Sequence, residues 1–318
     1  MNLKIIFATF CIIGTSTGAL LYAQPRKTEI HSAQVPAAQE KIKLGRYLFY
    51  DGDLSKDGSM SCGTCHRQKH AFTDGNKTHP GVNNDEGIFN VPTLGNIGEF
   101  NHLTWENQNV RTLEQHAVIP ITGTIPVEMG MNQQEKEIER RIAANPCYVE
   151  LFNKAFPDAQ GDSKNKVTID HIIQAISDFE RTLITNQSIW DTKKGFSFEM
   201  QQGETIFFGK GQCTNCHTPP LFTDQKFYKI NDHIKSEIRT PTLRNIELTA
   251  PYFHDGSIAT IQEAIIGHSP SKTNVPKLSQ QEINELIAFL NSLTDQKFIT
   301  NPNFSLPPAV CEKTKSSK

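Results

Sequence analysis

Two short segments of the chain repeat one arrangement of cysteine and histidine. In each, two cysteines are separated by two residues and followed directly by a histidine: Cys62, Cys65 and His66 in the first, and Cys213, Cys216 and His217 in the second. Two thiols one helical turn apart can reach the two vinyl groups of a porphyrin, and the next histidine is then aimed at its iron. The pattern therefore predicts two covalently bound haem c groups, with His66 and His217 as proximal iron ligands.

Other uses of paired cysteines fit less well. A zinc ribbon places its two cysteine pairs about 15 to 20 residues apart, whereas these pairs lie in different halves of the chain. A thioredoxin-like redox pair does not require a histidine directly after it in both copies. The duplicated motif therefore favours haem attachment.

The cysteine segments belong to a longer internal repeat. The same landmarks follow each segment in the same order, and their offset drifts by only about two residues. They are Phe72-Thr73-Asp74, Pro92-Thr93-Leu94 and Asn96 in the first half, and Phe222-Thr223-Asp224, Pro241-Thr242-Leu243 and Asn245 in the second. The repeat indicates two related domains, each with one copy of the same site.

Helices are the elements expected to position these motifs. Helix-like stretches at residues 41–50 and 199–208 precede the two cysteine segments. Apolar residues recur at helical spacing over 168–183 and again over 279–293, where Ser279 and Glu282 form a capping box. The sequence has no alternating strand pattern of useful length. We therefore predict a mainly α protein with long loops and a domain boundary near residues 186–195.

Composition excludes several classes of protein. With 318 residues the chain is long enough for two domains, each with its own core. It is 37% hydrophobic and 21% charged, which is typical of a globular protein. The net charge of -2 gives no electrostatic reason to expect nucleic acid or an anionic membrane surface as a partner.

The N-terminus has the pattern of an export signal, which we assign to residues 1–23. Lys4 is the only charge before an apolar run over residues 5–13, and a cleavage site is predicted after Ala23. The run is short for a membrane span, so export to the periplasm is favoured over an uncleaved anchor. In an oxidising compartment Cys147 and Cys311 could form a disulfide, and two unrelated thiols are the alternative.

Taken together, the motifs resemble those of the bacterial dihaem cytochrome c peroxidases, with the MauG-type enzymes as close relatives. The match covers nearly the whole mature chain, from about Leu44 to Leu293, and its motifs are specific. Besides both cysteine segments it includes Leu44-Gly45, Leu48-Phe49-Tyr50-Asp51, Ala71-Phe72-Thr73-Asp74-Gly75, Asn90-Val91-Pro92-Thr93-Leu94, Trp105, Val127-Glu128-Met129, Thr240-Pro241-Thr242-Leu243-Arg244-Asn245 and Pro251-Tyr252-Phe253-His254-Asp255-Gly256.

This resemblance implies two cytochrome c-like domains with different roles. Residues 24–185 would hold the peroxide-reacting haem, residues 186–310 the electron-transfer haem, and residues 311–318 would form a tail. Glu128 would be the distal acid and base, since a carboxylate above the iron can take a proton from peroxide and return it to the leaving oxygen. Gln115 matches a distal glutamine, and Trp105 matches a tryptophan that relays electrons between the haems.

The family also binds one calcium ion between its haems. The matching positions are Asn90, by its side-chain oxygen, and Thr249 and Pro251, by their backbone carbonyls. Oxygen ligands of this kind suit calcium, with water completing its shell.

At two positions this sequence departs from the peroxidase pattern. The second haem of the peroxidases usually has a distal methionine, but the equivalent position here is His268. We expect His217 and His268 to ligate this iron together, with a lowered potential. For the first haem, His79 lies in the loop that carries a removable ligand in peroxidases needing reductive activation. Either His79 is that ligand, or the first site is permanently open as in MauG-type enzymes.

The expected function is peroxide reduction in the periplasm, with electrons from a small cytochrome c or a cupredoxin. A MauG-type oxidation of a protein side chain is the first alternative. A non-catalytic dihaem carrier or redox sensor is the second. Family members often form dimers, so a homodimer is left open.

Overall fold

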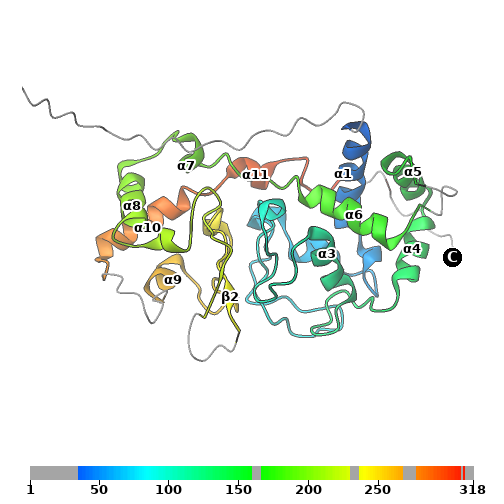
Figure 1. Ribbon diagram of the computed structural model, residues 1–318, viewed down its shortest axis with the longest axis horizontal. Coiled ribbons are helices and arrows are strands. Elements are labelled where there is room, and N and C mark those ends of the chain that lie inside the picture. Colours follow the sequence, from blue (N-terminus) through cyan, green and yellow to red (C-terminus); the bar gives the residue numbers. More distant parts are fainter. Residues whose placement is uncertain (1–34, 160–165, 230–235, 268–276, 309–310, 312–318) are drawn as a thin grey trace, which may run out of the picture.

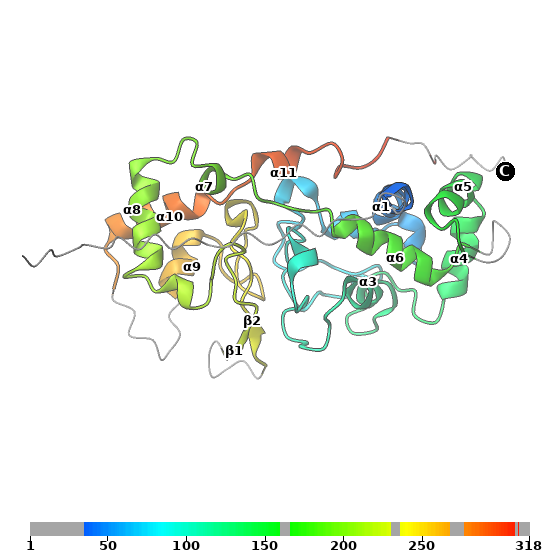
Figure 2. The same ribbon diagram turned by 45° about the horizontal axis from the view of Figure 1, so that its top comes forward.

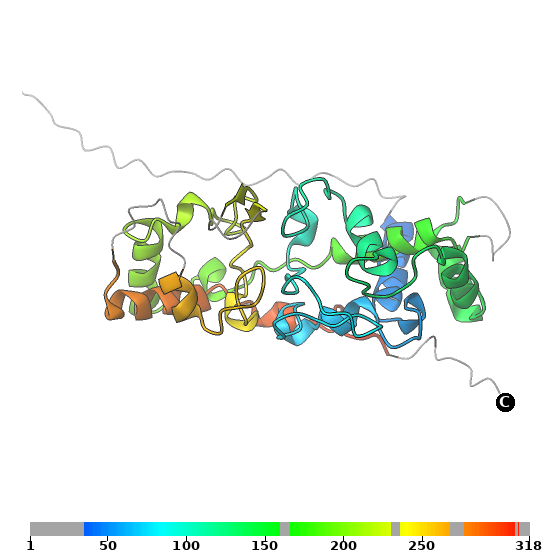
Figure 3. The same ribbon diagram turned by 90° about the horizontal axis from the view of Figure 1, so that it is seen from below.

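The computed structural model shows a mainly helical chain arranged as two lobes (Figure 1). It describes residues 35–159, 166–229, 236–267, 277–308 and 311. The two lobes stay distinct when the molecule is tilted forward or seen from below (Figures 2 and 3). Each lobe contains one Cys-x-x-Cys-His segment, as the internal repeat predicts.

Helices connected by long loops form the first lobe. Its α-helices are α1 (Val35–Phe49), α2 (Cys62–Cys65), α3 (Leu113–Thr122), α4 (Glu135–Ala143), α5 (Pro146–Ala155) and α6 (Ile169–Glu180). Short 3-10 helices lie between them: η1 (Gly52–Leu54), η2 (Gln68–His70) and η3 (Ile97–Glu99).

The second lobe repeats this plan with less regular structure. It contains α7 (Ile189–Thr192), α8 (Phe198–Phe208), η4 (Cys213–Asn215), η5 (Ile246–Leu248), α9 (Ile261–Gly267) and α10 (Gln280–Asn291), with the antiparallel strands β1 (Phe227–Tyr228) and β2 (Ile238–Arg239). A last helix, α11 (Gln296–Thr300), lies at the junction of the lobes (Figures 1 and 2). There Gln68 donates hydrogen bonds to the carbonyls of Phe298 and Asn301.

The helices begin where a side chain can accept hydrogen bonds from the free N–H groups of the first turn. Thr168 does so for α6, and Ser279 forms the predicted capping box with Glu282 at the start of α10. The helices predicted over residues 41–50, 168–183, 199–208 and 279–293 are all confirmed, with ends that differ by a few residues.

Close helix crossings show the repeat in the packing. α1 packs against α6 in the first lobe, and α8 packs against α10 in the second. Gly45 of α1 lies against the carbonyl of Ala175, and Gly203 of α8 lies in the same way against the carbonyl of Glu285. A β-carbon at either glycine would collide with that carbonyl oxygen. Glycine therefore permits the approach of both helix pairs.

One asparagine from each half of the repeat makes hydrogen bonds to Thr185, in the segment that links the lobes. The Asn96 amide bonds to the backbone N–H and carbonyl of Thr185, and the Asn245 amide donates to the Thr185 hydroxyl at 3.1 Å. The same hydroxyl donates to Asp295. Both asparagines have left-handed backbones, with φ of 59° and 60°, a conformation that asparagine tolerates well. The two landmark asparagines thus converge on one linker residue.

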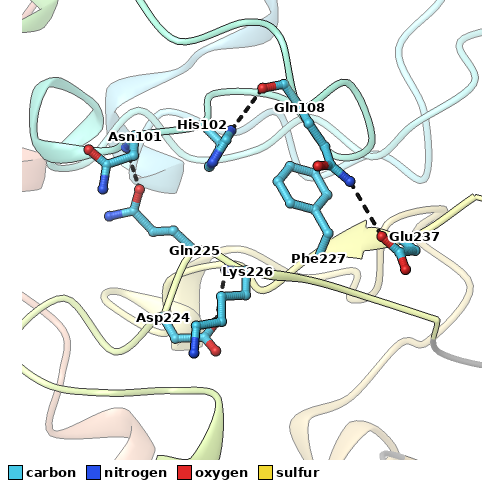
Figure 4. A pocket seen from close by; sticks show the side chains of 8 residues that line it. All are labelled: Asn101, His102, Gln108, Asp224, Gln225, Lys226, Phe227 and Glu237. Carbon is cyan, nitrogen blue, oxygen red and sulfur yellow. Dashed lines mark hydrogen bonds between the residues drawn. The ribbon is translucent and has the colours of Figure 1, made fainter.

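Direct contact between the lobes occurs along a seam, formed by residues 99–108 of the first lobe and residues 224–227 and 237–239 of the second. The N–H of Arg239 in β2 donates to the carbonyl of Trp105 at 2.7 Å. A cavity beside this bond is lined from both sides by Asn101, His102, Gln108, Asp224, Gln225, Lys226, Phe227 and Glu237 (Figure 4). Asn101 bonds to Gln225 and Gln108 bonds to Glu237 across it. Polar contacts therefore fix the lobes at the seam.

A disulfide joins Cys147 to Cys311, with 5.4 Å between the two Cα atoms. Of the two alternatives left open by the sequence, the disulfide is the one found. It ties the segment after α11 to α5 of the first lobe. Within the described residues, no helix combines the length and the apolar character needed to cross a membrane. The predicted signal, residues 1–23, lies outside them.

Replacing Gly203 by alanine should destabilise the second lobe. The new methyl group would push α8 away from the Glu285 carbonyl, and overpacking of this kind costs about 3 kcal/mol. Urea unfolding followed by circular dichroism measures the effect, with Gln201→Ala on the exposed face of α8 as the control. A Gly203→Ala protein as stable as the control would show that the crossing is not close.

Candidate dihaem site

The first cysteine segment folds as the short helix α2, which follows Ser61. Ser61 and Thr64 form a capping box that holds this turn. Cys62 and Cys65 take part in no disulfide. Burial raises the pKa of both thiols, that of Cys65 to about 12, and the nearby Glu128 carboxylate acts in the same direction. Two neutral thiols thus lie one turn apart, as thioether attachment requires.

A backbone carbonyl orients the histidine that follows α2. Nδ1 of His66 donates to the carbonyl of Phe72 at 2.7 Å, so only Nε2 is free to meet an iron. In the second lobe Nδ1 of His217 donates to the carbonyl of Phe222 at 3.1 Å. Phe72 and Phe222 both have positive φ, 63° and 54°. The repeat therefore reproduces the histidine, its acceptor and the unusual backbone turn.

Glu128 approaches the first cysteine segment from the loop after α3. The neighbouring Met129 N–H donates to the carbonyl of Pro120 in α3, and the Met129 carbonyl accepts from Lys56. These two bonds hold the Glu128 segment between α3 and the loop that precedes α2. Burial raises the pKa of Glu128. A half-buried carboxyl group that keeps its proton to higher pH thus lies near the first haem position.

The predicted distal role of Gln115 does not fit its place in the structure. Gln115 is the third residue of α3, where its side-chain oxygen accepts from the N–H groups of Arg111 and Thr112 in a capping box. The amide is therefore used to start the helix and is exposed to solvent. The next residue, His116, is near the site instead. Burial, and then the charge of His66, lower the pKa of His116 to about 4.

His79 lies in a loop that packs on the Glu128 segment. Two residues after Pro80, the N–H of Val82 donates to the carbonyl of Glu128 at 2.7 Å. Nδ1 of His79 bonds to the carbonyl of Pro80, which leaves Nε2 free. Burial lowers the pKa of His66, and the charge of the nearby His79 lowers it further. Its role as an iron ligand stays a prediction.

Trp105 lies buried in the seam and connects both lobes. Its indole N–H donates to the carbonyl of Asn90 at 2.8 Å. The N–H of Asn90 donates in turn to the carbonyl of His254 in the second lobe, and the carbonyl of Trp105 accepts from Arg239. The tryptophan thus sits in a chain of hydrogen bonds that crosses between the lobes twice.

The residues predicted to bind calcium are near the same chain. Nδ2 of Asn90 donates to the carbonyl of Asn76 at 2.9 Å, so its Oδ1 points the other way. Thr249 and Pro251 lie on either side of Ala250. The carbonyl oxygen of Ala250 would be 4.0 Å from a β-carbon at Gly75, the residue next to Asn76. The segment of Thr249 and Pro251 is therefore close to the loop that Asn90 contacts. No cluster of three His, Cys, Asp or Glu side chains suited to a metal occurs among the described residues.

The second cysteine segment contains the 3-10 helix η4 and lies beside an aromatic pair. His217 is buried and Cys213 and Cys216 take part in no disulfide. Trp190 packs edge-on against Phe222 at 4.8 Å. The predicted ligand His268 lies outside the described residues, directly after the end of α9.

Buried polar atoms without partners also suit a bound haem. Oε2 of Glu180, Nη1 of Arg239 and Nδ1 of His254 all lack a hydrogen-bond partner. With four thiols outside any disulfide and two histidines whose Nδ1 is held by a backbone carbonyl, this chain has the donor set that haem c needs.

Known proteins share this arrangement. Residues 39–195 match the di-haem cytochrome c peroxidase family, and residues 200–294 match the cytochrome c family. The cytochrome c551 peroxidase of Nitrosomonas europaea is 31% identical over 300 residues, which are 86% of this chain and 85% of that protein. The chain belongs to the di-haem cytochrome c peroxidase family.

MauG-type proteins are similar as well. The methylamine utilization protein MauG of Methylorubrum extorquens is 29% identical over 309 residues, 86% of this chain and 84% of that protein. The crystal structure of a MauG-like protein associated with microbial copper homeostasis has a TM-score of 0.77 and 30% identity, and it covers 91% of this chain and 99% of the other. The predicted family, the mainly α fold of two cytochrome c-like domains and the haem c cofactor are confirmed.

Sequence reasoning missed Glu180, although a signal was present. This acid follows Phe179 on the apolar face of the helix predicted over 168–183, where only apolar residues are expected. It is buried, and burial raises its pKa to about 8. Burial is the main reason for the raised pKa of Cys62, and the charge of Glu180 raises that pKa further. Glu180 therefore approaches the first site from α6.

Replacing Glu180 by glutamine should change how stability depends on pH. Between its ordinary pKa of 4.5 and the raised value of about 8, the folded protein keeps a proton that the unfolded chain releases. Stability therefore falls over this range as pH rises. Glu180→Gln should match wild type near pH 4.5 and be the more stable protein above pH 8.

Unfolding free energies from urea titrations at several pH values measure this difference. Glu99→Gln, at an exposed position, should keep the wild-type profile. Parallel profiles for wild type and Glu180→Gln would contradict the raised pKa.

Proposed function

We propose that the chain reduces hydrogen peroxide to water at the first haem, with electrons that enter at the second. Cys62, Cys65 and His66 would hold the first haem, and Cys213, Cys216 and His217 the second. The observation that carries this proposal is Glu128, a carboxyl group with a raised pKa beside the first pair of cysteines. The peroxidase names of curated relatives, such as that of Nitrosomonas europaea, support the same reaction.

Glu128 would move the protons of the reaction. Haem iron, when bound, would supply the electrons. The Glu128 carboxylate would accept a proton from one peroxide oxygen and return it to the other oxygen, which would leave as water as the O–O bond breaks. Two electrons and two protons in total convert one peroxide to two waters. A raised pKa suits this role because it favours the protonated form that donates to the departing oxygen.

His66 would contribute through its orientation. Because the Phe72 carbonyl accepts from Nδ1, the ring can neither rotate nor change tautomer without losing this bond. The buried pocket around it also includes His116, which stays neutral at pH 7 because its pKa is lowered to about 4. We propose that His116, rather than Gln115, is the neutral hydrogen-bonding group near the reacting oxygen.

Electrons would cross the seam by way of Trp105. Its indole lies between segments of both lobes and is fixed by hydrogen bonds at its ring N–H and its backbone carbonyl. An aromatic ring in this position shortens the gap that electrons must cross. His217 and His268 are proposed as the two ligands of the second iron. The donor would be a small cytochrome c or a cupredoxin.

The remaining proposals follow the family. A calcium ion would bind between the lobes at Asn90, Thr249 and Pro251 and would hold the Trp105 chain in place. Residues 1–23 would direct export to the periplasm, where residues 24–185 and 186–310 form the two haem domains before the tail at 311–318.

A MauG-type oxidation of a protein side chain is the second candidate. It is favoured by the MauG-like structure with a TM-score of 0.77 and by a histidine in place of the usual methionine at position 268. If His79 is not an iron ligand, the first site would also be open without prior reduction. Such an enzyme would consume peroxide but turn over small cytochromes slowly.

Replacing Glu128 by glutamine should lower peroxide reduction by about 10²- to 10⁴-fold, because glutamine cannot carry the proton. The rate of peroxide reduction is measured with the protein that carries both haems and with a reduced small cytochrome c as the electron donor. Glu86→Gln, at an exposed position of the neighbouring loop that carries His79, should keep wild-type activity.

Each outcome of this assay selects one hypothesis. Rapid wild-type turnover with the cytochrome supports the peroxidase, whereas slow turnover with retained peroxide consumption supports the MauG-type alternative. If the wild type consumes no peroxide with any donor, the protein is a carrier or sensor and the proposal fails.

A further inference from the structure

Arg239 is a buried cation for which the described residues, 35–159, 166–229, 236–267, 277–308 and 311, offer no anion. Its side chain is only 2% exposed, and its Nη1 has no hydrogen-bond partner. Nε donates to the carbonyl of Thr104 at 3.0 Å, and the guanidinium lies 5.4 Å from the centre of the Phe100 ring. No ion pair joins Arg239 to a carboxylate within the part of the chain that the structure describes, and burial lowers its pKa to about 10.

The second lobe contains a second buried arginine, which shows what is missing. Arg244 is 4% exposed, and its two terminal nitrogens donate to both carboxylate oxygens of Asp191, at 2.7 and 2.9 Å. Such a pair compensates for the loss of water around a buried charge. Arg239 has lost its water to a similar extent without that compensation. An anionic group from outside the polypeptide is therefore expected beside it.

The position of Arg239 identifies that group. In the seam Arg239 contacts Phe100, Thr104 and Trp105, which all belong to the first lobe. Its charge reaches His116 of α3, whose pKa is lowered by burial, by His66 and by Arg239. His116 is thus near both Arg239 and the histidine of the first haem. A haem bound at His66 would carry two propionate carboxylates, which are anions of the kind that this site lacks among the described residues.

We infer that Arg239 of the second lobe binds a propionate of the first haem through Nη1. The second lobe would then complete the cofactor site of the first. This inference rests on the haem attachment in the proposed function, but not on peroxide chemistry.

The pairing would raise the potential of the first haem. A fixed positive charge favours the reduced state, because reduction adds one negative charge. It would also keep the propionate ionised across the working pH range. Loss of the arginine should therefore lower the potential and allow the propionate to take up a proton as pH falls.

Redox titration of Arg239→Gln, monitored by the spectra of each haem, tests this inference. We expect the reduction equilibrium constant of the first haem to fall about tenfold, a shift of about 59 mV for one electron. The variant should also gain a pH dependence that wild type lacks. Glu128, Glu180 and His116 titrate in the same region in both proteins, so the difference between the two profiles is the quantity to compare.

Two further variants separate a specific pairing from a general effect. Arg239→Lys keeps the charge and should retain most of the potential. Arg111→Gln removes a charge from an exposed site just before α3 and should change neither potential nor pH profile. In resonance Raman spectra, the propionate bending band should shift in Arg239→Gln and not in Arg111→Gln.

An unchanged first-haem potential and propionate band in Arg239→Gln, with both haems still attached by mass, would overturn the inference. So would a shift confined to the second haem. Peroxide turnover of the wild type decides the proposed function separately, so either proposal can fail while the other stands.

Discussion

The hydrogen bond from each motif histidine to the carbonyl six or five residues later is the interaction on which the rest of the site depends. It fixes the ring at His66 and at His217, so that Nε2 is the nitrogen that would bind iron. The acceptor carbonyls are available only because Phe72 and Phe222 have a left-handed backbone, which costs free energy in a residue with a large side chain. Surrounding packing must compensate for that cost, since both phenylalanines are completely buried.

From this common unit the two lobes diverge in what surrounds the histidine. Around His66 the chain places Glu128, Glu180 and His116, all with pKa values shifted towards the neutral form by burial. A pocket of neutral but ionisable groups is suited to moving protons. Aromatic rings pack on the acceptor phenylalanine in both lobes, Phe49 on Phe72 in the first and Trp190 on Phe222 in the second. The buried ionisable groups of the first site agree with the proposal that peroxide reacts there.

Sequence alone predicted what depends on local pattern. Cysteine spacing gave the attachment sites, the repeat gave the two lobes, and apolar periodicity gave the main helices. It named Gln115 as a distal residue and gave no role to His116, because which residue of α3 is used for the helix cap depends on the fold. It also gave no role to Arg239. This residue matters because its guanidinium is buried and has no carboxylate partner among the described residues. That property depends on how the two lobes meet.

The number of haem groups bound through thioethers tests the account most directly. Intact mass spectrometry of the exported protein under denaturing conditions measures it, because covalently attached haem stays with the chain when the fold is lost. We predict a mass equal to that of the mature polypeptide plus two haems. A mass that corresponds to one haem or none would contradict the account.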